Sequence, residues 1–351
     1  MRDNTLILDR RGFLIALGVA AGAGALGVAT SGRANAETLA SNDWRRLVAE
    51  QYLDYGALSS VLPLQDGIEV WEGAHGGYMV VESAHREILE GSATAPSPYH
   101  GVAGESLYLG PGEYYTLTDD KAVGLANGEV MPARELRAMS RDATSSMQEL
   151  LVPTTSITDD RIGLLSSGGG LPPVKAGDVK SRVKNYGYIT GSTLYPNTAG
   201  ICGWVAGSII TRYWHARSSA RKLLPTKFRN GTNMTKSPNF ATHLQNGKAN
   251  GTWARTLKDQ LIWNAKNQSV AHSSSWALGN LGMWNELRAG YPFILFGSIP
   301  INKDKKKGGH AVVAYGETTG GQLITHYGWS GYTNIVLNAG LVGSNTKFRL
   351  V

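Results

Sequence analysis

The chain of 351 residues contains a single cysteine, Cys202, which stands where a glycine-containing turn leads into a helical pattern. A thiol in the first turn of a helix lies beside unpaired backbone N–H groups and the positive end of the helix dipole, and both lower its pKa. Such a thiol is a candidate nucleophile. The alternative is a cysteine that only fills the core, because free cysteine is among the most buried residue types.

A histidine in the C-terminal part of the chain supplies a candidate base for that thiol. His310 follows two glycines and opens an apolar segment with the pattern of a strand. Its imidazole can take the thiol proton and later protonate a leaving amine. The alternative is a structural histidine whose ring only makes hydrogen bonds within the fold.

The elements that must position Cys202 and His310 are helices followed by strands. A broad apolar stripe directly after Cys202 predicts a largely buried helix, which would hold the cysteine at its start. Helices are predicted at residues 203–217, 252–267 and 280–289, and strands at residues 186–189, 292–297, 310–315, 322–327, 334–337 and 347–351. Helices followed by an antiparallel sheet give this part of the chain an α+β arrangement.

The preceding part of the chain has a mixed α/β pattern. Helices are predicted at residues 42–55 and 131–151, and strands at residues 68–71, 77–81, 106–109 and 114–117. His75, His85 and His100 lack the spacing of metal ligands. We therefore expect no metal, no cofactor and no catalytic set in this region.

Charge divides the chain into two segments. Residues 37–180 contain 10 Lys and Arg against 21 Asp and Glu, a net charge of −11, and residues 181–351 contain 20 against 4, a net charge of +16. We call these segments the acidic half and the basic half. Opposite charges favour fast and specific association, so the two halves are expected to dock. Residues 166–173 have the composition of a linker that proteases cut readily.

Residues 1–36 have the features of an export signal. Arg10-Arg11-Gly12-Phe13-Leu14 precedes a weakly hydrophobic segment, and Ala34-Asn35-Ala36 fits a cleavage site. This pattern is typical of a twin-arginine signal, and the alternative, a membrane anchor, needs a longer apolar run. No later segment is apolar enough to cross a bilayer, so we expect an exported protein. An exported protein with one cysteine cannot use it for an internal disulfide, which favours a reactive thiol.

Four motifs in the basic half resemble those of papain-like cysteine peptidases, and most closely those of streptopain and related bacterial peptidases. In chain order they are Cys202-Gly203-Trp204-Val205-Ala206 with Tyr213, Gly290-Tyr291-Pro292-Phe293-Ile294, Gly309-His310-Ala311-Val312-Val313-Ala314-Tyr315-Gly316 and His326-Tyr327-Gly328-Trp329-Ser330-Gly331. The resemblance covers about residues 185–351. Upstream, residues 77–81 and 97–99 resemble parts of the pro-domain of streptopain-type zymogens.

The resemblance implies a domain organisation and an activity. Residues 181–351 would form a papain-like catalytic domain, with the cysteine on an N-terminal helix and a C-terminal antiparallel sheet. Residues 37–165 would form a mixed α/β pro-domain that inhibits the enzyme until the chain is cut within residues 166–180. The protein would then be a secreted cysteine endopeptidase made as a zymogen, with proteins or peptides as substrates. The alternative is that the acidic half is a permanent second domain.

The resemblance also implies supporting roles at positions where this chain departs from the family pattern. The Asn that orients the family's His corresponds here to His326, whose neutral imidazole can accept the same hydrogen bond. The family's Gln that polarises the substrate carbonyl corresponds to Pro196. Asn197, one residue later, is the candidate for the oxyanion hole together with the Cys202 N–H group. Trp329 is expected to shield the orienting hydrogen bond from water.

Other partners and function classes follow from charge and chemistry. The charge of the basic half, which includes the lysine-rich loop at residues 303–307, favours contact with polyanionic cell-surface polymers. The sequence has no motif that would contact bases in a groove of a nucleic acid, so we expect no specific nucleic-acid function. Two alternatives stay open: a cell-wall amidase or transglutaminase-like acyltransferase with the same Cys–His chemistry, and a non-catalytic secreted binding protein with a structural cysteine.

Overall fold

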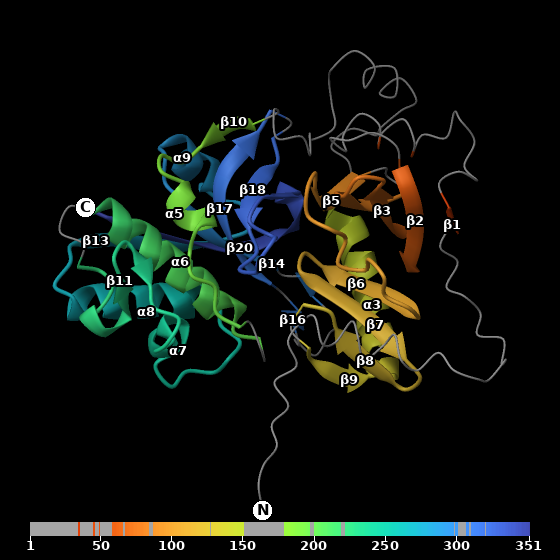
Figure 1. The fold of residues 1–351 in the computed structure, drawn as a ribbon, viewed down its shortest axis with the longest axis horizontal. Helices are drawn as coiled ribbons and strands as arrows, with labels where there is room; N and C mark the ends of the chain where they lie inside the picture. The colour runs from red at the N-terminus through yellow and green to blue at the C-terminus, as the bar shows by residue number, and fades with distance from the viewer. Residues whose placement is uncertain are drawn as a thin grey trace, which may run out of the picture. The chain divides into compact units, whose positions relative to one another are not determined.

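Strands from both halves of the chain pair into one antiparallel sheet in the computed structural model (Figure 1). The structure describes residues 34–35, 45, 49, 58–65, 67–83, 87–126, 128–150, 179–196, 200–218, 222–297, 299–300, 307–308, 310–319 and 321–351. All of these belong to one compact unit, residues 31–351.

Several predicted segments lie outside the described residues. They are the signal segment apart from Ala34 and Asn35, the helix at residues 42–55 apart from Arg45 and Ala49, the linker at residues 166–173, Asn197, and residues 303–306 of the lysine-rich loop. The domain boundaries proposed from the sequence therefore stay predictions.

The large sheet has twelve strands and crosses the boundary between the two halves. In spatial order they are β1 (Ala34–Asn35), β2 (Leu58–Gln65), β3 (Ile68–Gly73), β4 (Tyr78–Glu82), β5 (Glu87–Ser92), β19 (Ile335–Leu337), β18 (Leu323–His326), β17 (Ala311–Thr318), β14 (Phe293–Gly297), β20 (Val342–Leu350) and β13 (His272–Leu278), with β10 (Val179–Arg182) paired to β17. The halves meet where β5 pairs with β19, with Gly91 opposite Val336 and Glu90 opposite Leu337. We call this pairing the seam.

The rest of the acidic half is a second antiparallel sheet and a helix. The sheet runs β6 (Glu105–Gly110), β7 (Glu113–Thr118), β8 (Lys121–Gly124) and β9 (Val130–Pro132), and α3 (Ala133–Leu150) follows it. In Figure 1 these elements are drawn in yellow shades beside the orange strands β2, β3 and β5. Tyr108, Tyr114 and Tyr115 are buried between the elements of this half. Its core is therefore rich in tyrosine.

In the basic half, helices pack on the sheet that carries the candidate histidine. They are α5 (Gly187–Thr190), α6 (Cys202–Arg217), α7 (Phe240–Gln245), α8 (Ala254–Asn267) and α9 (Met283–Arg288). Helix α6 packs against β14 and β17, and α8 packs against β13 and β20. Every residue from Gly203 to Ala216 is buried, as the apolar stripe predicted. Short pieces complete this half: η3 (Thr226–Phe228), β11 (Arg229–Asn230), β12 (Asn233–Met234), β15 (Ile299–Pro300), β16 (Lys307–Gly308) and η4 (Ala339–Leu341).

The elements agree with an α+β arrangement, and one local prediction is wrong. Residues 186–189, expected as a strand, begin the short helix α5 instead. The amide of Ile189 donates to the Tyr186 carbonyl and that of Gly191 to the Gly187 carbonyl, so these groups are satisfied locally and not by a neighbouring strand. A four-residue segment with one buried apolar side chain fits either element, and its sequence pattern cannot separate them.

Candidate active site

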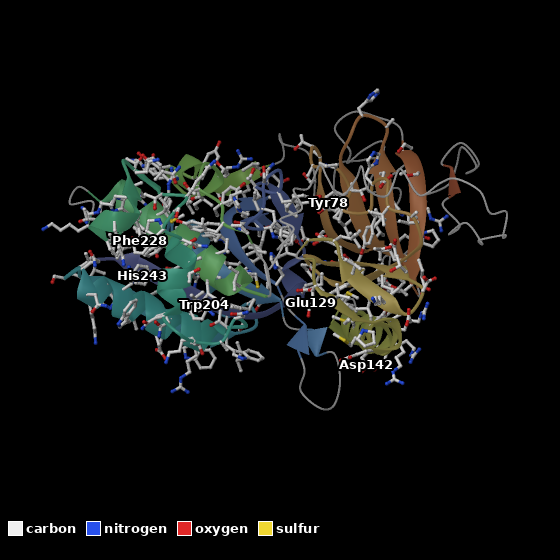
Figure 2. All side chains as sticks on the ribbon, turned by 60° about the horizontal axis from the view of Figure 1, so that its bottom comes forward. Tyr78, Glu129, Asp142, Trp204, Phe228 and His243 are labelled. Carbon is white, nitrogen blue, oxygen red and sulfur yellow. The ribbon has the colours of Figure 1, made fainter. Side chains whose placement is uncertain are left out.

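Cys202 is the first residue of α6, at the end of a tight turn. Gly200 has a φ of +76°, a conformation that glycine adopts without steric penalty. The next residue must also be small, because a Cβ on Gly203 would lie 2.2 Å from Thr252 Cγ2. The buried residues of α6, among them Trp204 (Figure 2), fix the helix against the sheet. The turn and the helix together hold the thiol in one place.

His310 directly precedes β17, and 4% of its surface is exposed. Its Nε2 atom lies 2.9 Å from the carbonyl oxygen of Tyr327. A carbonyl can only accept, so Nε2 carries the proton and Nδ1 is the unprotonated nitrogen that can act as a base. The ring of Trp329 stacks on the imidazole, with centroids 4.4 Å apart and an angle of 26° between the planes.

The fold brings Cys202 and the start of β17 together. The backbone amide of Ala311, the residue after His310, is near enough to the Cys202 sulfur to lower the pKa of the thiol. Helix α6 packs against β14 and β17, which explains how residues so distant in sequence come near one another. Cys202 and His310 thus lie on neighbouring elements.

Both groups of this site are held in their neutral forms. Burial raises the pKa of the Cys202 thiol to about 11; the Ala311 amide lowers that pKa and the Glu113 carboxylate raises it further. Burial lowers the pKa of His310 to about 4, against the opposing effect of its hydrogen bond to Tyr327. At neutral pH the pair is thus a thiol and a neutral imidazole. The lowered thiol pKa expected from the helix start is wrong for this state, because burial outweighs the helix dipole.

The cover over the site comes from the acidic half. Gly112 lies in the turn between β6 and β7 with a φ of +80°, and a Cβ there would be 2.6 Å from His310 Cδ2. The backbone of this turn therefore rests directly on the imidazole. The next residue, Glu113, is close enough for its charge to act on Cys202, and its carboxylate accepts a hydrogen bond from the Tyr115 hydroxyl. The turn accounts for much of the burial at this site.

Trp329 lies where its predicted shielding role requires. Its ring stacks on His310 and makes edge contacts with Tyr327 and Tyr332, at centroid distances of 5.9 Å to each. The edge of this aromatic group reaches the acidic half, since Tyr114 of β7 is 6.4 Å from Trp329 between ring centroids. The aromatic rings thus exclude water from the hydrogen bond between His310 and Tyr327.

His326 does not occupy the orienting position expected for it. Its ring is fully buried at the end of β18, and its Nδ1 atom accepts a hydrogen bond of 2.8 Å from the Gly328 amide. Burial lowers its pKa to about 4. Among the described residues, the hydrogen-bond partner of the His310 ring is the Tyr327 carbonyl, one residue further along. Every residue has a backbone carbonyl, so the sequence pattern does not indicate that Tyr327 binds the His310 ring. The resemblance pointed to the side chain of His326 for this role.

Of the two residues expected to form an oxyanion hole, only Cys202 is among the described residues. Asn197 lies outside the described residues, and its role stays a prediction. Pro196, at the position of the family's Gln, is exposed. The side chain of Thr252, which touches Gly203, has a buried hydroxyl without a hydrogen-bond partner among the described residues.

Sequence analysis missed a buried carboxyl close to this site. Glu90 of β5 accepts hydrogen bonds from the hydroxyls of Tyr114 and Tyr327, so it links the acidic half to the residue that holds His310. Burial raises its pKa to about 7. The sequence of β5, which contains both Glu87 and Glu90, gives no sign of this, because the partners come from separate segments.

Within the described part of the chain, no group of three or more His, Cys, Asp or Glu side chains could hold a metal ion. None of the helices in that part combines the length and apolar character of a membrane span.

Comparisons with known proteins show a likeness in structure and none in sequence. No family model matches the chain, and no curated protein matches it. A solved structure of a fragment of prointerpain A from Prevotella intermedia is similar over 82% of this chain and 96% of that chain, with 10% sequence identity and a TM-score of 0.39.

Proposed function

We propose that this protein is the inactive precursor of an exported cysteine endopeptidase. Cys202 is the nucleophile and His310 the general base and acid, and the acidic half covers both until it is released. The observation that carries this proposal is the turn at Gly112, which rests on the His310 ring while burial keeps the thiol and the imidazole neutral. The turn therefore lies on the imidazole that the thiol needs as its base.

Release of the acidic half would restore the chemistry of the pair. With the cover removed, the imidazole regains solvent and its pKa returns toward the ordinary value near neutrality, while the thiol pKa falls. Nδ1 of His310 then takes the Sγ proton and forms a thiolate–imidazolium pair. The Tyr327 carbonyl keeps Nε2 protonated and the ring oriented. Trp329 keeps water from that hydrogen bond.

The proposed reaction has two steps. The Cys202 sulfur attacks the peptide carbonyl carbon, the carbon–nitrogen bond breaks, and the amine leaves with the proton from His310. The acyl group is then held as a thioester. His310 next takes a proton from water, whose oxygen attacks the thioester, and the sulfur leaves and recovers that proton. The Cys202 N–H group and Asn197 are the proposed donors to the oxyanion in both steps.

The single cysteine makes this proposal simple to test. The purified full-length chain is treated with iodoacetamide at neutral pH before and after a cut within residues 166–180, and hydrolysis of unfolded protein is measured in parallel. We expect the alkylation rate to rise by about 100-fold or more after release, because a fall of two pH units in the thiol pKa increases the thiolate fraction by that factor. Hydrolysis should rise with it.

Two outcomes would contradict the proposal. A Cys202→Ala variant that still hydrolyses protein after the cut rules out the nucleophile. An uncut chain as active as the cut one rules out the inhibitory role of the acidic half. Hydrolysis of purified peptidoglycan in place of protein would assign the same Cys–His pair to a cell-wall amidase.

A further inference from the structure

A buried carboxyl lies at the point where the two halves join. The side chain of Glu90 is fully buried in β5, beside the seam. Tyr114 donates to one of its oxygens from within the acidic half, and Tyr327 donates to the other from the basic half, at 2.5 Å. The backbone amide of Gly112 lies near enough to lower the pKa of this carboxyl. Glu90 is therefore bound to both sides of the contact.

The surroundings of Glu90 are phenols and not cations. Tyr78 of β4 faces it next to Tyr114, with 3.4 Å between the two hydroxyls. Tyr99 and Tyr108 complete the buried group around the carboxyl, and its charge raises their pKa values. Among the described residues no Lys, Arg or His forms an ion pair with it. Burial without a cation disfavours the carboxylate and raises the pKa of Glu90 to about 7.

Two of the residues around Glu90 also contact the candidate active site. Tyr327 contacts Glu90 through its hydroxyl and His310 through its carbonyl. Gly112 is near enough for its amide to lower the pKa of Glu90, and its Cα atom lies against the His310 ring. A change at the carboxyl therefore reaches the turn that covers the imidazole and the carbonyl that orients it.

Hydrogen bonds along the seam would have to break if the halves separated. The amide of Asn338 donates to the Leu89 carbonyl at 3.0 Å, and its side-chain amide donates to the Ile88 carbonyl at 3.2 Å. The hydroxyl of Tyr332 donates to the Pro96 carbonyl at 3.0 Å. These neutral bonds do not change with pH, so the pH dependence of docking comes from the titratable groups of the contact. They are the carboxyls of Glu90 and Glu113 and the imidazole of His310, whose pKa of about 4 would return toward 6.5 on release and so oppose the two carboxyls.

We propose that Glu90 is a pH-dependent latch, which keeps the acidic half docked while its carboxyl is protonated and weakens docking when it ionises. This inference rests on the proposed function in one respect, that opening of the contact would expose Cys202 and His310 to substrate. The contact between the two halves exists whatever reaction the site performs. A carboxyl from the far side of the seam would thus control access to the site.

The direction of the pH effect follows from the two states of the carboxyl. Docked, Glu90 has a pKa of about 7; released into water, it returns to the ordinary value of 4.5. Docking is therefore strongest below about pH 4.5 and weakens as the pH rises to about 7. The shift corresponds to about 300-fold in the docking equilibrium, of which about 70-fold falls between pH 5 and pH 8.

A second carboxyl acts in the same direction. Burial raises the pKa of Glu113 to about 7, the Tyr115 hydroxyl lowers that pKa and the charge of Glu129 raises it. Glu113 lies beside Cys202 in the covering turn. Its ionisation on release would add to the effect of Glu90, and the two contributions are separated by substituting one at a time.

The test measures opening of the seam in the full-length Cys202→Ala chain, which cannot cleave itself. Hydrogen–deuterium exchange of the Asn338 amide is followed from pH 5 to pH 8 and corrected for the intrinsic pH dependence of exchange. We expect protection to fall by at least about tenfold over this range. Adding Glu90→Gln should remove most of that fall, whereas adding Glu105→Gln, an exposed carboxylate paired with Arg137, should not.

Each outcome decides the proposal. Protection of Asn338 that is constant from pH 5 to pH 8 in the Cys202→Ala chain overturns the latch, and this arm needs no further variant to fold. An unchanged pH dependence in the chain that also carries Glu90→Gln overturns the assignment to Glu90. Because exchange requires no peptidase activity, the latch and the proposed function can fail separately.

Discussion

The two halves of the molecule bury opposite kinds of titratable group and treat them in the same way. The acidic half contains the fully buried Glu90 and the half-buried Glu113, whose pKa values are raised to about 7, and the basic half buries His310 and His326, whose pKa values are lowered to about 4. In each case burial favours the neutral form. The net charges of −11 and +16 therefore do not meet as ion pairs at these four positions. In the docked form these carboxyls and imidazoles are shifted toward their neutral forms.

Under the proposed function, this difference would let the acidic half inhibit the basic half. A carboxyl that ionises near neutrality and an imidazole that is neutral there share the same contact. Separation of the halves would return both groups to water, where the carboxyl is charged and the imidazole can accept a proton. The protonation states needed for the proposed catalysis and those of the docked form are thus opposed.

The largest expected effect distinguishes the two buried histidines of the basic half. In the released protein, His310→Ala should lower the rate of peptide hydrolysis by about 1,000-fold or more, because it removes the general base. His326→Leu should leave kcat within a few-fold and lower thermal stability, since it leaves the Gly328 amide without its acceptor. Steady-state kinetics and thermal unfolding measure the two effects. Equal losses of kcat would restore His326 as the orienting residue.

A smaller effect is expected from the covering turn. Gly112→Ala would place a Cβ against the His310 ring and should increase the alkylation rate of Cys202 in the uncut chain by about tenfold, because overpacking opens the contact. Gly101→Ala is the matched control. Its φ of +71° imposes the same backbone strain, but nothing lies within 4 Å of the added Cβ. If both variants react alike, strain and not contact with His310 explains the change.

The smallest effect concerns the hydroxyl that joins the halves. Tyr327→Phe removes one hydrogen bond to Glu90 and keeps the backbone carbonyl that holds His310. Docking should weaken by about 1 kcal/mol, the usual net contribution of one hydrogen bond. Cys202 labelling in the uncut chain should rise several-fold at neutral pH, and kcat after release should be unchanged. A loss of kcat would mean that the phenol orients the imidazole.

Local patterns predicted much of the fold. The apolar stripe after Cys202 predicted α6, and runs of apolar residues between glycines predicted β3, β4, β14 and β17 near their observed bounds. Among these elements, α6 and β17 pack together and bring Cys202 and the start of β17 near one another. Strand β13 was missed because its serines at positions 273–275 have no apolar period, and pairing with β20 makes it a strand.

The rest depends on contacts between distant segments. The pKa of Cys202 is an example, because its helix start predicts a lowered value and its burial in the assembled site raises it. The seam joins β5 to β19, and no pattern within either strand specifies its partner. His310 is oriented by a backbone carbonyl, which any residue could supply. The sequence could suggest Cys202 and His310 as candidates but not the protonation states in which the fold holds them.

The continuous sheet has a consequence for activation. A cut in the connecting segment does not break the pairing of β5 with β19, so the severed acidic half stays bound until it dissociates. While the chain is intact, the covering half is present at the high effective concentration of a tethered partner. After the cut it becomes a separate inhibitor whose occupancy depends on the amount of protein in solution. In the proposed zymogen, dilution on leaving the cell would therefore cause the severed acidic half to dissociate and the site to open.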